Sequence, residues 1–246
     1  MTPETSETGT GLSRRTLAEE TLIVLGLTFL ASAAYAIVSL LSAPIRGVSV
    51  AVFREVGLER QVLDIVFGLV PVWLVVYLVR RSGEGTAGIG LAWDEPRRDL
   101  GRGAVLALLV ATVGLGVYVL AVEIGLNRIV IPVPPTGHWW TVPILALGAF
   151  QNGLLEETIV AAYLLHRLRQ QGWSDPAALW SSAVLRGAYH LYQGFGGFTG
   201  NLALGLFFGA YYQRKRRTWP LVLAHTLVDL LAGLGYLLLR DRASFI

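Results

Sequence analysis

The chain has 246 residues, of which 54% are hydrophobic and 15% are charged, and its mean hydropathy is +0.56. An ordinary globular domain carries about 25% charged residues, so this composition excludes a soluble single domain, a disordered chain and a basic nucleic-acid-binding domain. The net charge of +3 is too small for a phosphate-binding surface, and we expect no nucleic-acid partner. Cysteine is absent, which excludes disulfides, thiolate catalysis and thiolate metal sites.

Apolar segments follow one another along most of the chain. A helix that crosses a membrane needs about 20 mostly apolar residues. We therefore predict an all-α, multi-pass transmembrane bundle in which the lipid bilayer is an obligatory partner. The seven predicted spans are 21–43, 61–79, 103–122, 141–165, 177–192, 198–212 and 219–239.

The predicted domains are an N-terminal cytoplasmic tail (1–20), a group of N-terminal membrane helices (21–126) and a C-terminal helical core (139–240). Within the tail, residues 1–10 are polar and are predicted to be disordered. With the N-terminus inside, the inner segments carry thirteen basic residues and the outer segments six, which favours a cytoplasmic N-terminus and an outer C-terminus. Arg supplies nineteen of the twenty basic residues, a bias that suggests a GC-rich bacterial genome. We therefore expect an integral protein of the bacterial plasma membrane.

Ionisable side chains occur inside the predicted spans, where each costs about 2.5–3.5 kcal/mol on insertion scales. The first three spans contain only Asp64, near an end. The last four contain six such residues: Glu156, Glu157, Arg186, His190, His225 and Asp229. Such residues almost always face a bundle interior and pair there, and the helical rise of about 1.5 Å per residue allows them to converge between the cytoplasmic surface and the midplane.

The spacing of these residues predicts how they face. His225 and Asp229 share a helix face, as do Arg186 and His190, because each pair is spaced i,i+4. Adjacent Glu156 and Glu157 cannot point the same way on a helix. We expect one of them to face the site and the other to face a neighbouring helix or a cation.

The set of residue types is suited to hydrolysis. A carboxylate beside a neutral His can hold a water and take its proton, and a second His with a hydrogen-bonding neighbour can stabilise an oxyanion. Alternatively, His190, His225 and a Glu such as Glu156 can form a three-ligand zinc site with an open position. The residues alone leave metal-free and zinc chemistry open.

These residues and their order resemble the CPBP family of membrane-embedded CAAX prenyl endopeptidases and bacteriocin-processing enzymes, also called the Abi family. The family's Glu-Glu-x-x-x-Arg motif matches Glu156-Glu157, its Phe-x-x-x-His motif matches His190, and its His-x-x-x-Asn/Asp motif matches His225 and Asp229. The resemblance covers about residues 141–232. Flanking strings such as Arg186-Gly-Ala-Tyr-His-Leu-Tyr-Gln-Gly resemble a branch common in actinobacteria.

The resemblance implies peptide-bond hydrolysis in or near the membrane. By analogy Glu156 would be the general base, His190 would orient the water, and His225 with Asp229 would stabilise the oxyanion. The preferred reading needs no metal cofactor, with zinc as the alternative. The implied partner is a membrane-associated protein or peptide substrate, and the prenylated CAAX substrate of the eukaryotic members is not carried over.

The chain departs from the family pattern at two positions. The motif Arg falls at Ala161, and the motif Phe falls at Arg186. We hypothesise that Arg186 supplies the missing cation and pairs with Glu157, so that both support the site structurally. The departures keep two other functions open. One is a proteolytically silent scaffold or bacteriocin-immunity protein, and the other is a small ion-coupled transporter.

Overall fold

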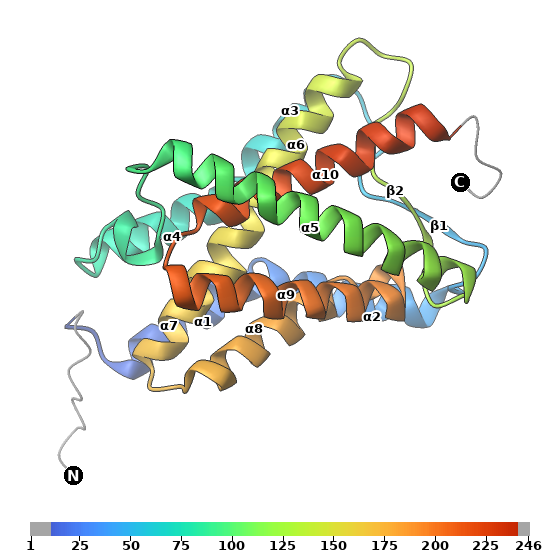
Figure 1. The fold of residues 1–246 in the computed structure, drawn as a ribbon. Coiled ribbons are helices and arrows are strands. Elements are labelled where there is room, and N and C mark those ends of the chain that lie inside the picture. The colour runs from blue at the N-terminus through green and yellow to red at the C-terminus, as the bar shows by residue number, and fades with distance from the viewer. Residues whose placement is uncertain (1–10, 241–246) are drawn as a thin grey trace.

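The computed structural model describes residues 11–240, and the predicted disordered tail 1–10 lies outside them. The described chain is an all-α bundle with two short strands, as the sequence predicts (Figure 1). Its elements are α1 (Arg14–Gly26), α2 (Phe29–Ser42), β1 (Ser49–Ala51), α3 (Leu58–Gly68), α4 (Val70–Arg81), η1 (Thr86–Ile89), α5 (Pro96–Glu123), β2 (Ile129–Ile131), α6 (Thr141–Glu156), η2 (Glu157–Tyr163), α7 (Leu164–Gln170), α8 (Asp175–Tyr189), η3 (Leu191–Gln193), α9 (Phe195–Lys215) and α10 (Trp219–Leu239).

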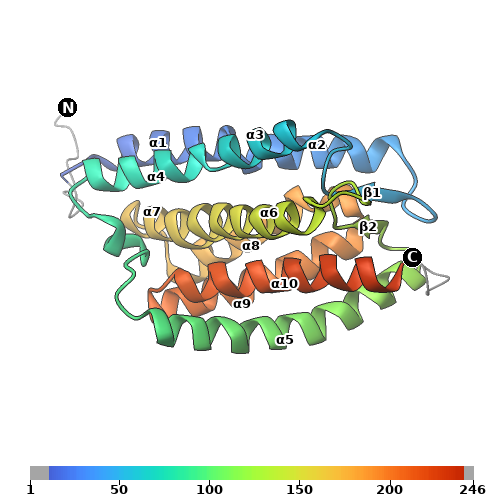
Figure 2. The ribbon, with the colours of Figure 1, turned by 90° about the horizontal axis from the view of Figure 1, so that it is seen from above.

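The helices lie in layers, with one continuous helical rod in the middle. Figure 2 shows α1 to α4 on one side, α5, α9 and α10 on the other, and α6 and α7 between them. Segment η2 joins α6 to α7 and contacts α4, α8, α9 and α10. This rod is therefore the element against which the other layers pack. The strands β1 and β2 pair in parallel, with Ser49 opposite Ile129.

Every predicted span overlaps helical structure, although the lengths differ. The segments Leu58–Arg81, Pro96–Glu123 and Trp219–Leu239 are long and apolar enough to cross a membrane. The pair α1 and α2 adds a fourth candidate, bent by 44°. Helix α8 has only 15 residues, which is less than the roughly 20 that a straight span needs. The count of seven stays a prediction.

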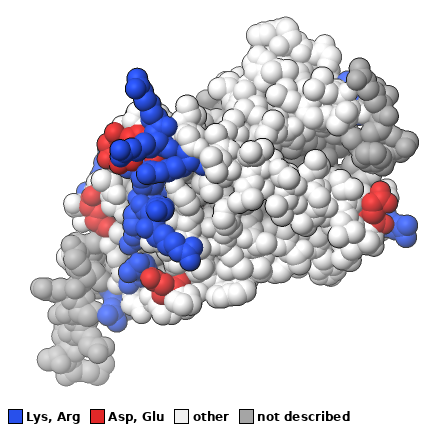
Figure 3. All heavy atoms as spheres, in the orientation of Figure 1, with Lys and Arg blue, Asp and Glu red and all other residues white. Residues whose placement is uncertain are grey.

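Basic side chains gather at one end of the bundle, the end that the sequence predicts to be cytoplasmic. Figure 3 shows them as a stripe over the beginning of α5 and the end of α9. The last turns of α4, α7 and α9 each carry two basic residues. The side of the membrane on which this end lies stays a prediction.

A partly buried polar cluster ties the central rod to the end of α4 at this basic end. The carboxylate of Glu84 contacts His166 and accepts hydrogen bonds from Arg167 Nη1 at 2.6 Å, Ser82 Oγ at 2.8 Å and Gln170 Nε2 at 2.8 Å. Burial by itself raises the pKa of Glu84, but the hydrogen bond and charge of His166, followed by Ser82 and Arg167, lower it to about 2. The Glu84 cluster thus favours the ionised carboxylate in the folded protein.

At the opposite end, Arg128 joins the end of α2 to η3. Its side chain is buried, with 1% exposure. The guanidinium makes five hydrogen bonds of 2.7–3.1 Å, to the carbonyl oxygens of Ser39, Ala43, Pro44 and Tyr192 and to the hydroxyl of Ser39. The backbone N–H of Arg128 donates to the carbonyl of Gln193 at 2.6 Å. One side chain thus fixes the turn that follows His190.

Replacing Arg128 by Ala should destabilise the protein, because four backbone carbonyls lose a donor that is itself buried. A fully buried acceptor left without a partner costs about 1–3 kcal/mol, and each of these part-buried carbonyls should cost less than that. We expect a large fall in the thermal unfolding midpoint. This midpoint is measured by tryptophan fluorescence of the protein in detergent micelles. Arg46→Ala, which removes an exposed Arg from the same end, should leave the midpoint nearly unchanged. Equal midpoints for the two variants would contradict the role given to Arg128.

Stability should also depend on the ionisation of Glu84. Its folded-state pKa of about 2 lies below the ordinary value of 4.5, so its contribution is complete above pH 4.5 and is lost as the pH falls toward 2. In thermal melts, wild type should therefore be more stable than Glu84→Gln at pH 7. The gap between their midpoints should close between about pH 5 and pH 2. A gap that stays constant with pH would show that the carboxylate charge is not involved.

Candidate functional site

The site begins where the central rod changes its winding. Segment η2 is a π-helix inside an otherwise α-helical rod, and all of its residues are buried. Single π turns within α-helices occur frequently at functional sites. The hydroxyl of Ser182 on α8 donates to the carbonyl of Val160 at 2.8 Å, which supplies a partner for the backbone of this segment. The change of winding coincides with the adjacent acids Glu156 and Glu157.

One buried guanidinium binds both acids. Arg186 on α8 is 1% exposed. Its Nη1 donates to Glu157 Oε2 at 3.2 Å, and its Nη2 contacts Glu157 Oε1 and lies 3.2 Å from Glu156 Oε2. The ion pair hypothesised between Arg186 and Glu157 is therefore present. A buried charge needs such a partner because it has left water.

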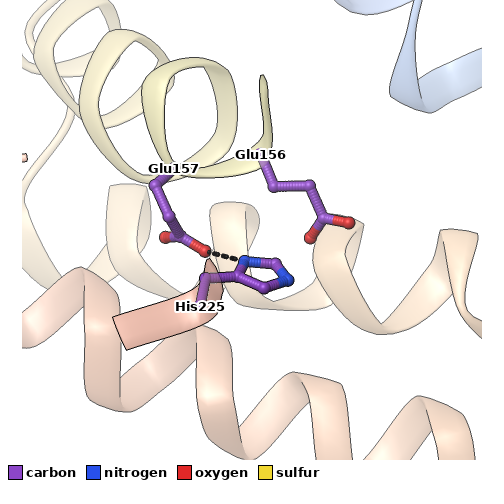
Figure 4. A group of neighbouring side chains, drawn as sticks. All are labelled: Glu156, Glu157 and His225. Atoms are coloured by element: carbon purple, nitrogen blue, oxygen red, sulfur yellow. Dashed lines mark hydrogen bonds and ion pairs between the residues drawn. The ribbon is translucent and has the colours of Figure 1, made fainter. Parts of the chain in front are cut away.

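Glu157 also holds His225. Figure 4 shows the bond between Glu157 Oε1 and Nδ1 of His225, which is 2.7 Å long. An ionised carboxylate only accepts, so Nδ1 carries the hydrogen in this bond. The other ring nitrogen, Nε2, lies 3.6 Å from Asp229 Oδ2 and 3.4 Å from Asn152 Nδ2. Asn152 Nδ2 in turn donates to Asp229 Oδ2 at 3.0 Å.

Glu156 and His190 are each fixed on one side only. Oε2 of Glu156 accepts from the hydroxyl of Tyr189 at 2.7 Å, and its Oε1 has no hydrogen-bond partner within residues 11–240. Nδ1 of His190 lies 2.9 Å from the carbonyl oxygen of Arg186, to which it donates. A neutral His190 then presents the lone pair of Nε2. Each residue thus keeps one acceptor atom free.

A cavity of about 920 Å³ collects these groups. The predicted catalytic residues Glu156, His190, His225 and Asp229 all line it, together with apolar side chains such as Phe29 and Leu145. The predicted supporting residues Glu157 and Arg186 do not line this cavity and lie buried behind it. As expected, one acid faces the site while its neighbour faces a cation. The structure adds that Glu156 reaches the same cation.

The donor atoms that resemble a metal site surround a cation already. Glu156, Glu157 and His225 each offer one ligand atom within 4.8 Å of the others, with Glu157 in place of the His190 of the zinc alternative. Arg186 Nη2 contacts all three, lying 3.2 Å from Glu156 Oε2 and 3.2 Å from His225 Nδ1. Zinc binds such ligands at about 2.0–2.2 Å and would meet the guanidinium charge. In this group the guanidinium thus occupies the place that a metal ion would take, and the zinc alternative with Glu156, His190 and His225 stays a prediction.

Sequence reasoning missed two residues of the site, Asn152 and Tyr189. Asn152 precedes Glu156 by one helical turn and so shares its face. Tyr189 precedes His190, and its ring packs at 4.5 Å from that of Phe29. A polar Asn within an apolar run was a usable signal for the first. The hydroxyl contact of Tyr189 follows from the tertiary structure alone.

Removing the shared guanidinium should be as damaging as removing its main partner. Arg186→Ala leaves two acids buried without a cation, and breaking a buried ion pair in this way costs about 3–5 kcal/mol. We expect Arg186→Ala and Glu157→Ala to lower the thermal unfolding midpoint to a similar extent. The double variant should be more stable than the sum of the two losses predicts. A well-folded Arg186→Ala protein would contradict this interpretation.

The comparison with known families agrees with this geometry. Residues 138–231 match the family model described as type II CAAX prenyl endopeptidase Rce1-like. No curated protein and no solved structure matches the chain. The matched segment runs from just before α6 into α10 and contains all six ionisable residues predicted from the last four spans. This segment of the chain is therefore similar to the CAAX prenyl endopeptidases, in agreement with the family resemblance that the sequence motifs indicate.

Proposed function

We propose that this protein is an intramembrane endopeptidase in which Glu156 activates a water without the help of a metal. The observation that carries the proposal is the convergence of Glu156, His190 and His225 on one cavity. The proposed substrate is a segment of a membrane-associated protein or peptide. The apolar side chains of the cavity are suited to such a segment.

The free acceptor atoms support a specific role for each residue. Oε1 of Glu156 takes a proton from a water whose other hydrogen is held by Nε2 of His190. The water oxygen attacks the carbonyl carbon of the peptide bond, and the carbonyl oxygen becomes an oxyanion. Glu156 then gives its proton to the departing nitrogen as the C–N bond breaks. The products are one new carboxylate and one new amine.

The contacts favour Glu156 over Glu157 as the base. Glu157 is 0% exposed, and its two oxygens are bound to Arg186 and His225. Its proposed role is to hold these two side chains in place. Metal independence is supported by Arg186, whose Nη2 contacts Glu156, Glu157 and His225 and so places a positive charge beside two of the three ligands of the zinc alternative.

Glu156→Gln should abolish cleavage while the protein stays folded, because Gln can still accept from Tyr189 and Arg186 but cannot take a proton. The loss expected for a general base is about 100- to 10,000-fold. The assay uses lipid-anchored peptides of varied sequence in phosphatidylcholine–phosphatidylglycerol vesicles, with products identified by mass spectrometry. Thermal melts serve as the folding control.

A chelator added to the wild-type protein distinguishes metal-free hydrolysis from zinc-dependent hydrolysis. We expect cleavage to continue unchanged in its presence. Loss of cleavage on chelation, restored by zinc, would overturn the metal-free mechanism. A wild type that cleaves none of the peptides would overturn the proposed protease function and favour the scaffold.

A further inference from the structure

The proposed reaction creates an oxyanion that needs hydrogen-bond donors. Donors aimed at this charge are often the largest single contribution to such catalysis. The family motif allows Asn or Asp at its last position, and here that position is Asp229. An ionised carboxylate has no hydrogen to donate and would repel a neighbouring oxyanion. The donor beside His225 must therefore come from another residue.

Asn152 has the position that this donor requires. Its side chain lines the cavity together with Glu156 and His225. Because the carboxylate of Asp229 accepts, it must be the amide nitrogen of Asn152 that faces it, at 3.0 Å. The amide nitrogen carries two hydrogens, and Asp229 takes one of them. The second remains available beside Nε2 of His225, which lies 3.4 Å away.

We infer that Asn152 is a catalytic residue that donates a hydrogen bond to the oxyanion, next to Nε2 of His225. This inference rests on the proposed function. Asp229 is then a positioning residue, which turns the amide nitrogen toward the site. The contact of 3.4 Å between Asn152 and His225 is long for a hydrogen bond. An oxyanion is a stronger acceptor and would displace it.

Several other polar side chains of the cavity hydrogen-bond to partners away from His225 and Asp229. The hydroxyl of Tyr189 donates to Glu156. Gln193 donates to Tyr192, and Asn201 donates to the carbonyl of Gly197 within its own helix. Asn152 is distinguished from these amides by its contacts with both His225 and Asp229.

The test compares Asn152→Leu, which has a similar size and no donor, with wild type in the vesicle peptide assay. We expect kcat to fall about 100- to 1,000-fold, as on removal of a single oxyanion donor, with little change in KM. A phosphinic peptide, whose charged oxygen mimics the intermediate, is the second probe. The inhibition constant of this peptide should rise by the same factor as kcat falls. If Asn152 had only a structural role, the two factors would differ.

Two further variants keep the test decisive. Gln171→Leu removes an amide near the end of the central rod, outside the cavity, and should leave kcat unchanged. Should Asn152→Leu fail to fold, the double variant Asn152→Asp with Asp229→Asn retains the pair and its charge. Because it moves the amide to position 229, it should be folded and should cleave faster than Asn152→Asp alone.

The outcomes separate this inference from the proposed function. Suppose that wild type cleaves the peptides, that Glu156→Gln does not, and that folded Asn152→Leu has the kcat of wild type. This result would overturn the role of Asn152 and would still support the protease function. A fall in kcat without a matching rise in the inhibition constant would also overturn it. A wild type without cleavage would overturn both.

Discussion

The structure depends on one buried cation shared by two adjacent carboxylates. Arg186 joins α8 to the central rod through Glu156 and Glu157, and Glu157 extends the connection to His225 on α10. Each of these charges is costly at membrane depth and is stable only with the others in place. The same network that holds three helices together therefore fixes the orientation of the groups facing the cavity.

The two ends of the bundle support this centre in different ways. At the basic end, the Glu84 cluster anchors the central rod to α4 through charged side chains. At the other end, Arg128 binds backbone carbonyls and fixes η3, directly after His190. A charge that binds backbone oxygens is insensitive to the identity of neighbouring side chains. The position of His190 is consequently tied to a residue outside the segment that matches the family.

The sequence predicted the all-α bundle and the residues that line the cavity because ionisable groups are rare in apolar runs. Asp229, His225 and Glu156 stand out there without any knowledge of the fold. The π winding of η2 could not be predicted, since no residue pattern distinguishes it from α-helix in an apolar segment. Arg128 was counted only as an outer cation. Its five hydrogen bonds go to the end of α2, the residues just after it and η3, segments that lie far from Arg128 in the sequence.

Ala161 occupies the position of the family's motif Arg and is buried in the hydrophobic core, with 2% exposure. The cation that neutralises the two acids therefore comes from a different helix in this chain. What the two acids require is a cation within reach, whichever helix carries it. A chain with the family's Arg at this position would leave both acids without a cation if that Arg were lost before Arg186 was gained. Gaining Arg186 beforehand keeps the acids neutralised at every step. A motif search that requires an Arg at position 161 would overlook this chain, in which Arg186 supplies the cation.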